Sequence, residues 1–206
     1  MRRAYRRVLF IVSVFGIVCC CGFLACVEDF IALAFGESSV LGFVTTVLMT
    51  LNMYITLTNI PIISVQNATG THKLDAVNMI IQAVAVIIFS YAGGLLWGLN
   101  GIILGLIIPT FALTSVTKGI IISRACLKEK AASYLLDLVL VFVKCAAACA
   151  LTVFACGCIN TGSLIFDILL KGVISVFVSV AVIALTSFKD ENFRFMLKFL
   201  HIYRKG

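Results

Sequence analysis

The sequence predicts an all-α integral membrane protein with six transmembrane helices. Of its 206 residues, 62% are hydrophobic and only 12% are charged. A soluble domain has about 45–50% apolar and about 25% charged residues, so this chain has too little polar surface to cover a globule in water. Its apolar residues gather in runs near the ~20 that a helix needs to cross ~30 Å of hydrocarbon. The runs show none of the period-2 alternation typical of a membrane barrel.

The six predicted spans follow one another along the chain as a single membrane domain. They cover residues 8–27, 40–64, 74–92, 98–123, 134–158 and 172–188. Helices are favoured because every backbone N–H and C=O must be paired inside the bilayer. No soluble domain is expected, and residues 189–206 form a basic cytoplasmic tail.

The first span also has the basic and then apolar pattern of a secretory signal. Its apolar stretch, however, is longer than the usual 7–15 residues of a signal, and five further spans follow. We therefore expect a retained first helix.

The basic residues predict the orientation. All but three of the 16 Lys and Arg residues fall before the first span, after the even-numbered spans or in the tail; the exceptions are Lys118, Lys144 and Lys171. The positive-inside rule places those segments, and both termini, in the cytoplasm. Topology and anionic lipid headgroups explain the net charge of +7, so no nucleic-acid partner is expected.

A polar passage, VQNATGTHKLDAVN at residues 65–78, separates the second and third spans. Gly70 can take the positive φ that ends a helix and reverses the chain. Asp75 is expected to cap the next helix. Asn67 heads an N-x-Thr glycosylation sequence, but the predicted topology places it in the cytoplasm. The passage therefore predicts a tight cytoplasmic hairpin.

Residues 59–110 resemble the second half of the bacterial polysaccharide flippases. The positions that carry the resemblance are a proline within a helix, an Ala-x-Gly followed by Lys, and glycines that open the next helix, here Pro61, Ala68, Gly70, Lys73, Gly98, Gly101 and Gly105. Residues 30–37 and the tail are similar to further segments of these proteins. The family comprises the O-antigen and lipid-linked oligosaccharide exporters, whose superfamily also holds the multidrug extruders.

The resemblance implies alternating-access export of polysaccharide precursors across the bacterial plasma (inner) membrane. The implied ligand is a polyprenyl-pyrophosphate-linked oligosaccharide. Such flippases have twelve or more helices in two lobes, so this chain would supply only the C-terminal lobe and would need a separate N-terminal lobe or self-association. A multidrug or cation antiporter lobe and a transport-inactive membrane fragment are the alternatives. A truncated product, a split subunit and a fragment all remain open.

Charged residues within the spans are the first candidates for a site, because intramembrane charges are costly and usually functional. Lys144 lies near mid-depth in the fifth span, with Asp137 seven residues earlier on the same helical face. Lys144 is either a cavity cation or the charge partner of Asp137. Lys118 either lines the cavity or extends to the headgroups. Asp167 and Lys171 are expected to form an interfacial pair.

Uncharged polar residues form two predicted stripes. Asn52, Thr56 and Asn59 share one face of the second span, and Asn78 and Gln82 share one face of the third. They either form hydrogen bonds between helices or line a hydrated cavity. Pro61 interrupts the hydrogen-bond ladder nearby and is interpreted as the mark of a bent helix.

The sequence does not predict an enzyme, a metal site or a cofactor. It has two histidines and lacks both an H-x-x-x-H pattern and paired intramembrane carboxylates, so no catalytic residue is assigned. The nine cysteines follow no zinc pattern and are expected to be buried small apolar side chains. A glycine-rich nucleotide loop is also missing, so an ion or substrate gradient would drive transport.

Overall fold

The structure, a computed structural model, describes residues 2–36, 38, 40–127, 131–157 and 164–187. Within them it is all-helical and contains no strand, which confirms the predicted class. The long helices are α1 (Arg2–Phe35), α2 (Phe43–Thr69), α3 (His72–Pro109), α5 (Ala131–Cys156) and α6 (Leu164–Ser187). Three short elements, η2 (Thr110–Lys118), α4 (Gly119–Ile122) and η3 (Ser123–Leu127), continue α3.

Five helical stretches of the described chain are long and apolar enough to cross a membrane, where the sequence predicts six spans. One of the five, Asp75–Cys126, has 52 residues. A straight helix of that length would measure about 78 Å, more than twice the hydrocarbon thickness. None of the side chains in its most apolar window is buried inside the protein, as expected for a helix with lipid as its solvent.

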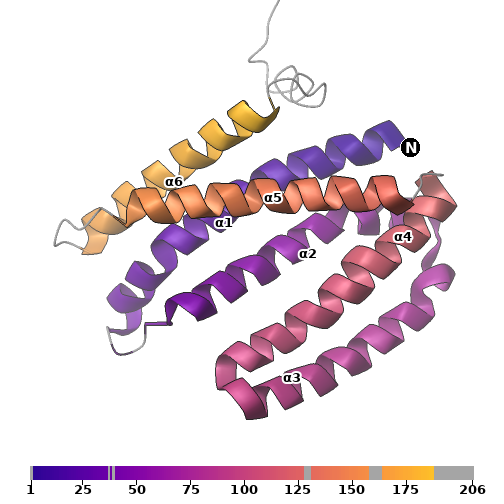
Figure 1. Cartoon of the computed structure of the whole chain (residues 1–206), viewed down its shortest axis with the longest axis horizontal. Coiled ribbons are helices and arrows are strands. Elements are labelled where there is room, and N and C mark those ends of the chain that lie inside the picture. Colours follow the sequence, from indigo (N-terminus) through magenta and orange to yellow (C-terminus); the bar gives the residue numbers. More distant parts are fainter. Residues whose placement is uncertain (1, 37, 39, 128–130, 158–163, 188–206) are drawn as a thin grey trace, which may run out of the picture.

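The long stretch reverses direction between the predicted third and fourth spans. Trp97 (φ −132°, ψ 18°) and Gly98 (φ 57°, ψ −135°) have non-helical backbone angles inside α3. The Ser90 hydroxyl donates to the carbonyl of Ile102, twelve residues further along, at 3.4 Å. Figure 1 shows the two arms of this hairpin side by side, joined by a sharp turn.

Glycines allow the two arms to approach closely. A Cβ atom on Gly101 would lie 1.9 Å from the carbonyl oxygen of Gly93, and one on Gly105 would lie 2.4 Å from the Cα atom of Ser90. Neither position can hold a larger residue unless the arms separate. Gly101 and Gly105 therefore pack within the hairpin, and Gly98 supplies its positive φ at the turn.

Two helices extend beyond the predicted spans. α1 extends the predicted span 8–27 at both ends, and α6 begins at Leu164, where residue 172 was predicted. Apolar runs mark the membrane core, whereas Arg, Glu and Leu are good helix formers that continue a helix beyond it. Residues 158 and 188 and the tail 189–206 lie outside the described residues.

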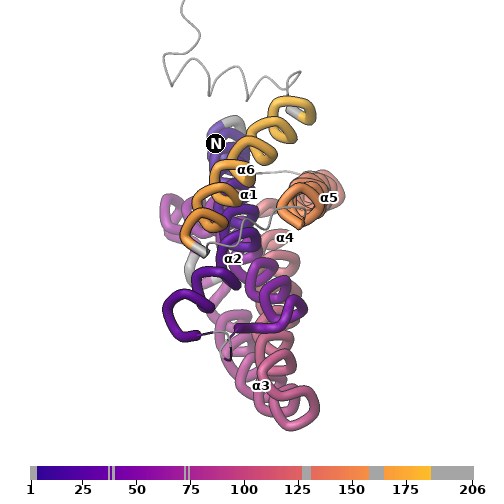
Figure 2. Tube along the Cα trace, turned by 90° about the vertical axis from the view of Figure 1, so that its left-hand side faces the viewer, coloured from indigo at the N-terminus to yellow at the C-terminus, as the bar shows by residue number. Residues whose placement is uncertain are grey.

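α1 is the central helix and packs against α2, α5 and α6. Its Ile17, Cys20 and Cys21 lie in the largest buried core with Tyr54 of α2 and Cys145 of α5. In both views α6, α1, α2 and the α3 hairpin follow one another across the molecule, with α6 and the hairpin at opposite sides (Figures 1 and 2).

Polar contacts concentrate at the two ends of the helices. At one end, the Arg6 end, Arg6 of α1 forms an ion pair with Asp137 of α5. At the other, the Asp29 end, Asp29 of α1 forms an ion pair with Lys171 of α6, a partner that the sequence analysis does not name. Arg6 and Asp29 are separated by about 35 Å along α1, close to the ~30 Å of a hydrocarbon core. The spacing fits a protein that crosses a bilayer.

Candidate functional site

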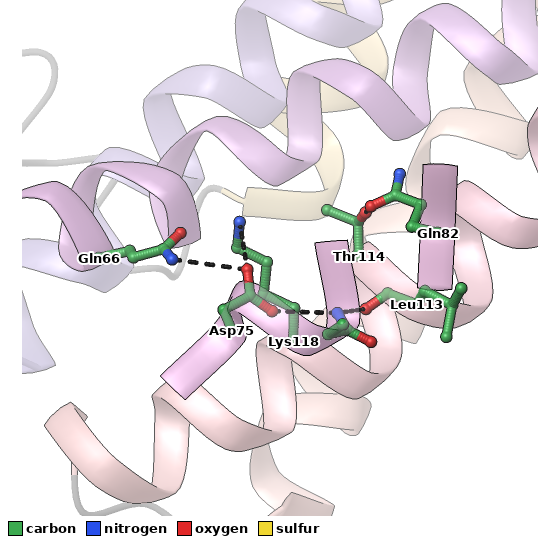
Figure 3. A network of polar contacts seen from close by, with 7 residues as sticks. Gln66, Asp75, Gln82, Leu113, Thr114 and Lys118 are labelled. Carbon is green, nitrogen blue, oxygen red and sulfur yellow. Dashed lines mark hydrogen bonds and ion pairs between the residues drawn. The ribbon is translucent and has the colours of Figure 1, made fainter. Parts of the chain in front are cut away.

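A buried ion pair lies near the Arg6 end, between Lys118 of η2 and Asp75 in the first turn of α3 (Figure 3). The Lys118 Nζ is 2.9 Å from Asp75 Oδ2, and the two side chains are 6% and 0% exposed. The interpretation that Lys118 extends to the headgroups is therefore wrong. A buried ammonium requires a counter-charge, and Asp75 supplies it.

Two amide groups also bind the Asp75 carboxylate. Asn78 Nδ2 donates to Asp75 Oδ1 at 3.0 Å, and Gln66 Nε2 of α2 donates to Oδ2 at 3.5 Å. The same Asn78 nitrogen donates to the carbonyl of Leu113 at 2.9 Å. Asp75 was predicted to cap α3, but the cap position is Thr71. The carboxylate lies inside the protein and joins α2, α3 and η2, because Lys118 offers it a full positive charge.

The lysine is held on an unusual backbone. η2 is a π-helix that follows Pro109, whose ring nitrogen cannot donate to the helix ladder. The Thr117 hydroxyl donates to the carbonyl of Ala112, five residues earlier, at 2.9 Å. π-helical turns are rare and occur frequently at functional sites. This segment therefore marks the surroundings of Lys118 as a candidate site.

The polar network continues deeper between the helices. Thr114 donates to Gln82 Oε1 at 2.7 Å, and Ser115 donates to Asn59 Oδ1 at 2.9 Å. The Tyr134 hydroxyl of α5 donates to the Ser115 carbonyl at 2.6 Å. Of the two alternatives for Asn59 and Gln82, the structure shows hydrogen bonds between helices.

The three polar residues of the predicted stripe on the second span do not share one environment. Asn59 is buried in the network, Asn52 is half-buried, and Thr56 is exposed. The Thr56 hydroxyl donates to the carbonyl of Asn52 in its own helix at 2.9 Å. A threonine can satisfy its hydroxyl locally in this way, so it needs no partner on a neighbouring helix.

The hairpin at residues 70–71 has the predicted geometry. Gly70 has φ 66°, and its N–H donates to the carbonyl of Gln66, so it ends α2 as expected. The family-like residues Ala68 and Lys73 are exposed beside it. α2 passes through Pro61 as one continuous helix.

A cavity of about 170 Å³ lies between α1, α5 and α6. Its charged lining residues are Arg6, Asp137 and Lys144, and Ser13 and Thr186 add hydroxyl groups to otherwise apolar walls. Arg6 Nη2 is 3.2 Å from Asp137 Oδ2, with side chains 37% and 28% exposed.

Lys144 lies two helical turns beyond Asp137 on the cavity-lining face of α5. The helical spacing predicted this shared face. Asp137 forms an ion pair with a third charged residue, Arg6, which the sequence analysis counted only toward topology. Two cationic groups and one carboxylate therefore line the cavity, which favours an anionic ligand.

Cysteine and metal chemistry adds no further site within the described part of the chain. Its eight cysteines are free thiols, and Cys158 lies outside it. No group of three or more His, Cys, Asp or Glu side chains there is arranged to hold a metal ion.

The sequence analysis missed Gln66, Ser115 and Tyr134 as members of the network. Gln66 carried a weak signal, a polar residue close to the end of an apolar run. Ser115 and Tyr134 carried none, because serine and tyrosine are common in membrane helices without such a role.

Comparisons with models of known protein families, with curated proteins and with solved structures found no match for this chain. Its class is that of a multi-pass membrane protein, and any function must be inferred from the residues described above.

Proposed function

We propose that this chain crosses the bacterial plasma membrane six times, with both termini in the cytoplasm. We propose further that it forms one lobe of a transporter that exports lipid-linked polysaccharide or oligosaccharide precursors by alternating access. The observation that carries the proposal is the cavity lined by Arg6 and Lys144 around a single carboxylate, Asp137.

Six crossings are consistent with the hairpin inside the longest apolar stretch. Each of its arms, residues 75–96 and 99–126, measures more than 30 Å as a helix, so each is long enough to cross the hydrocarbon core. With a turn at Trp97 and Gly98, two crossings by these arms would return the chain to the side of Arg6. In this arrangement the described basic residues Arg6, Arg7, Lys73 and Arg124 would share that side, which supports its assignment to the cytoplasm.

The cavity suits a diphosphate group. The guanidinium of Arg6 can donate two parallel hydrogen bonds to phosphate oxygens, and the ammonium of Lys144 provides a compact positive charge. The hydroxyls of Ser13 and Thr186 add donors. Sugars attached to the diphosphate need more room than about 170 Å³, which a second lobe or a second copy would provide.

Asp137 gives the cavity a charge balance before the ligand binds. It lies 3.2 Å from Arg6 and so supplies a counter-charge to the cations of the cavity. An entering diphosphate would compete with Asp137 for Arg6 and would gain Lys144 as a second partner. Release on the far side would return Arg6 to Asp137.

A cation antiporter lobe is less consistent with the site. Asp137 would then be the coupling carboxylate, yet it forms an ion pair with Arg6. Arginine stays protonated in proteins, so a cationic drug would have to displace a permanent charge.

Binding of a soluble diphosphate tests the proposal. The purified chain in lipid nanodiscs should bind a short-chain polyprenyl diphosphate carrying one sugar, measured by isothermal titration calorimetry. Lys144→Gln should weaken binding by about tenfold, which corresponds to the loss of one charge-assisted hydrogen bond. The matched control is Lys73→Gln on the exposed hairpin, which should bind as the parent does. Equal affinity of the parent and the Lys144→Gln variant would contradict the proposed site.

A further inference from the structure

The Asp75 site is built like a binding site for a small cation. Its carboxylate has no exposed surface and receives the Lys118 ammonium at 2.9 Å. Side chains from α2 and α3 complete the site, since Gln66 and Asn78 each direct an amide nitrogen toward the carboxylate. These contacts come from three separate helical segments, so the site exists only in the folded protein.

The Asp75 carboxylate itself suits a hard monovalent cation, and the groups that now contact it are the Lys118 ammonium and two amide nitrogens. Carboxylate, side-chain amide and backbone carbonyl oxygens are the ligands that such ions prefer. Gln66 and Asn78 each carry a carbonyl oxygen at the other end of the amide, so rotation of the amide exchanges a donor for a ligand. The carbonyl of Leu113 already lies 2.9 Å from Asn78 Nδ2. An ion in place of the ammonium would bind the Asp75 carboxylate directly, and rotation of the Gln66 and Asn78 amides would bring their oxygens to that side.

We propose that Lys118 is a tethered cation that occupies a monovalent-cation site at Asp75. Neither the folded state of the chain nor its transport then requires Na⁺ or K⁺. The transport part of this inference rests on the proposed function, whereas the part on the folded state does not.

Covalent attachment of the ammonium to the chain explains the presence of a lysine at position 118. A covalently attached ammonium has a very high effective concentration at the carboxylate, so it cannot be diluted or lost as a free ion can. The π-helical backbone of η2 ends at Lys118 and directs its side chain between α2 and α3 (Figure 3). The site is thus permanently filled by the chain itself.

Removal of the tethered group tests the proposal. Lys118→Ala deletes the atoms from Cγ to Nζ, which correspond to n-propylammonium. In nanodiscs at constant ionic strength, replacement of N-methylglucamine by Na⁺, K⁺ or Li⁺ should raise the thermal transition of this variant. A rise of about 3 °C or more is expected for a ligand well above its dissociation constant. The parent should shift by less than about 1 °C, the precision of such a measurement.

Two variants control for non-specific salt effects. Lys118→Met fills most of the lysine volume without a charge, so it should respond less than Lys118→Ala. The double variant Lys118→Ala with Asp75→Asn lacks the carboxylate and should not respond. If none of the three alkali ions stabilises Lys118→Ala, or if the parent responds equally, the proposal is overturned. A response to n-propylammonium alone would also overturn it, because only an amine would then fit.

A variant that folds poorly can still be tested. Lys118→Ala would be solubilised with each cation present, and the folded yield measured by size-exclusion chromatography. The yield should rise with an alkali ion, and an equally low yield in every salt would count against the inference. Export by the parent should be the same in Na⁺ and in K⁺, and a requirement for Na⁺ would refute the transport part. The two proposals can fail separately. If the chain does not bind the diphosphate but an alkali ion stabilises Lys118→Ala, the proposed function is refuted and the cation site is supported.

Discussion

The hydroxyl of Tyr134 lies against the backbone of Gly119, where a Cβ atom would come within 2.1 Å of it. From this position it donates to the Ser115 carbonyl at 2.6 Å and joins α5 to η2. Both residues are buried, and the contact needs the missing side chain of glycine. It therefore holds in place the π-helical segment that carries Lys118.

Gly119→Ala should lower the stability of the protein by about 1–3 kcal/mol, because the added methyl group overlaps the Tyr134 ring as well as its hydroxyl. Thermal unfolding in nanodiscs measures the effect. The control is Gly22→Ala in α1, where the nearest atom to the new Cβ is Ser175 Oγ at 3.8 Å, an ordinary contact. Stability of the Gly119→Ala variant equal to that of Gly22→Ala would show that the segment adjusts freely.

Gly101→Ala should force apart the arms of the α3 hairpin, because its Cβ would lie 1.9 Å from the Gly93 carbonyl oxygen. Backbone atoms cannot move aside as a flexible side chain can. We expect a lower thermal transition and faster proteolysis near the turn at Trp97. Gly42→Ala is the control, since a Cβ there meets nothing within 4 Å. Unchanged proteolysis would argue against the close approach.

The two ion pairs at the Arg6 end should differ in their contribution to stability. Asp75→Asn leaves Lys118 buried without a counter-charge and should cost about 3–5 kcal/mol. Asp137→Asn affects a pair whose side chains are 37% and 28% exposed, so about 0–1 kcal/mol is expected. Unfolding in parallel samples provides the comparison. A larger loss of stability for Asp137→Asn than for Asp75→Asn would contradict the assignment of Asp75–Lys118 as the buried pair and Arg6–Asp137 as the accessible one.

The two alternatives for Lys144 differ in how Asp137 affects the variants. If Lys144 binds the diphosphate, Lys144→Gln should impair export and Lys144→Arg should retain part of it, since the charge stays but the donor geometry changes. If Lys144 serves only to balance Asp137, the addition of Asp137→Asn should restore export to Lys144→Gln. Export assays of the two single variants and the double variant separate the alternatives. Full export by Lys144→Gln alone would exclude both roles.

The proposed six crossings can be tested with single cysteines in a cysteine-free background. Trp97→Cys should react with a membrane-impermeant maleimide added outside intact cells. Asn67→Cys and Ala132→Cys should react only after the cells are opened. All three positions lie at helix ends or turns and have exposed side chains that suit labelling. External labelling of all three would rule out both the orientation and the number of crossings.

The helical class could be predicted from the sequence because composition decides whether water or lipid is the solvent. The helix ends could not, since a helix continues past the apolar run that marks the membrane core. α1 includes the basic residue Arg2, and α6 begins at Leu164, ahead of the charged residues Asp167 and Lys171. The ion pair of Asp75 and Lys118 could not be predicted from the sequence either. No helical periodicity relates two residues on different helical segments, and the π-helix that orients Lys118 has no simple sequence pattern.

The tight hairpin of α3 also affects how the chain enters the membrane. Its turn contains no charged residue, and Asn100 at the start of the second arm accepts a hydrogen bond from Thr45 of α2 at 2.7 Å. A connection this short and this apolar can pass through the hydrocarbon with little loss of hydration. The glycines let the arms pack directly against each other. In the proposed six-crossing topology, both arms would therefore enter the lipid together, without the transfer of a hydrophilic loop across the bilayer.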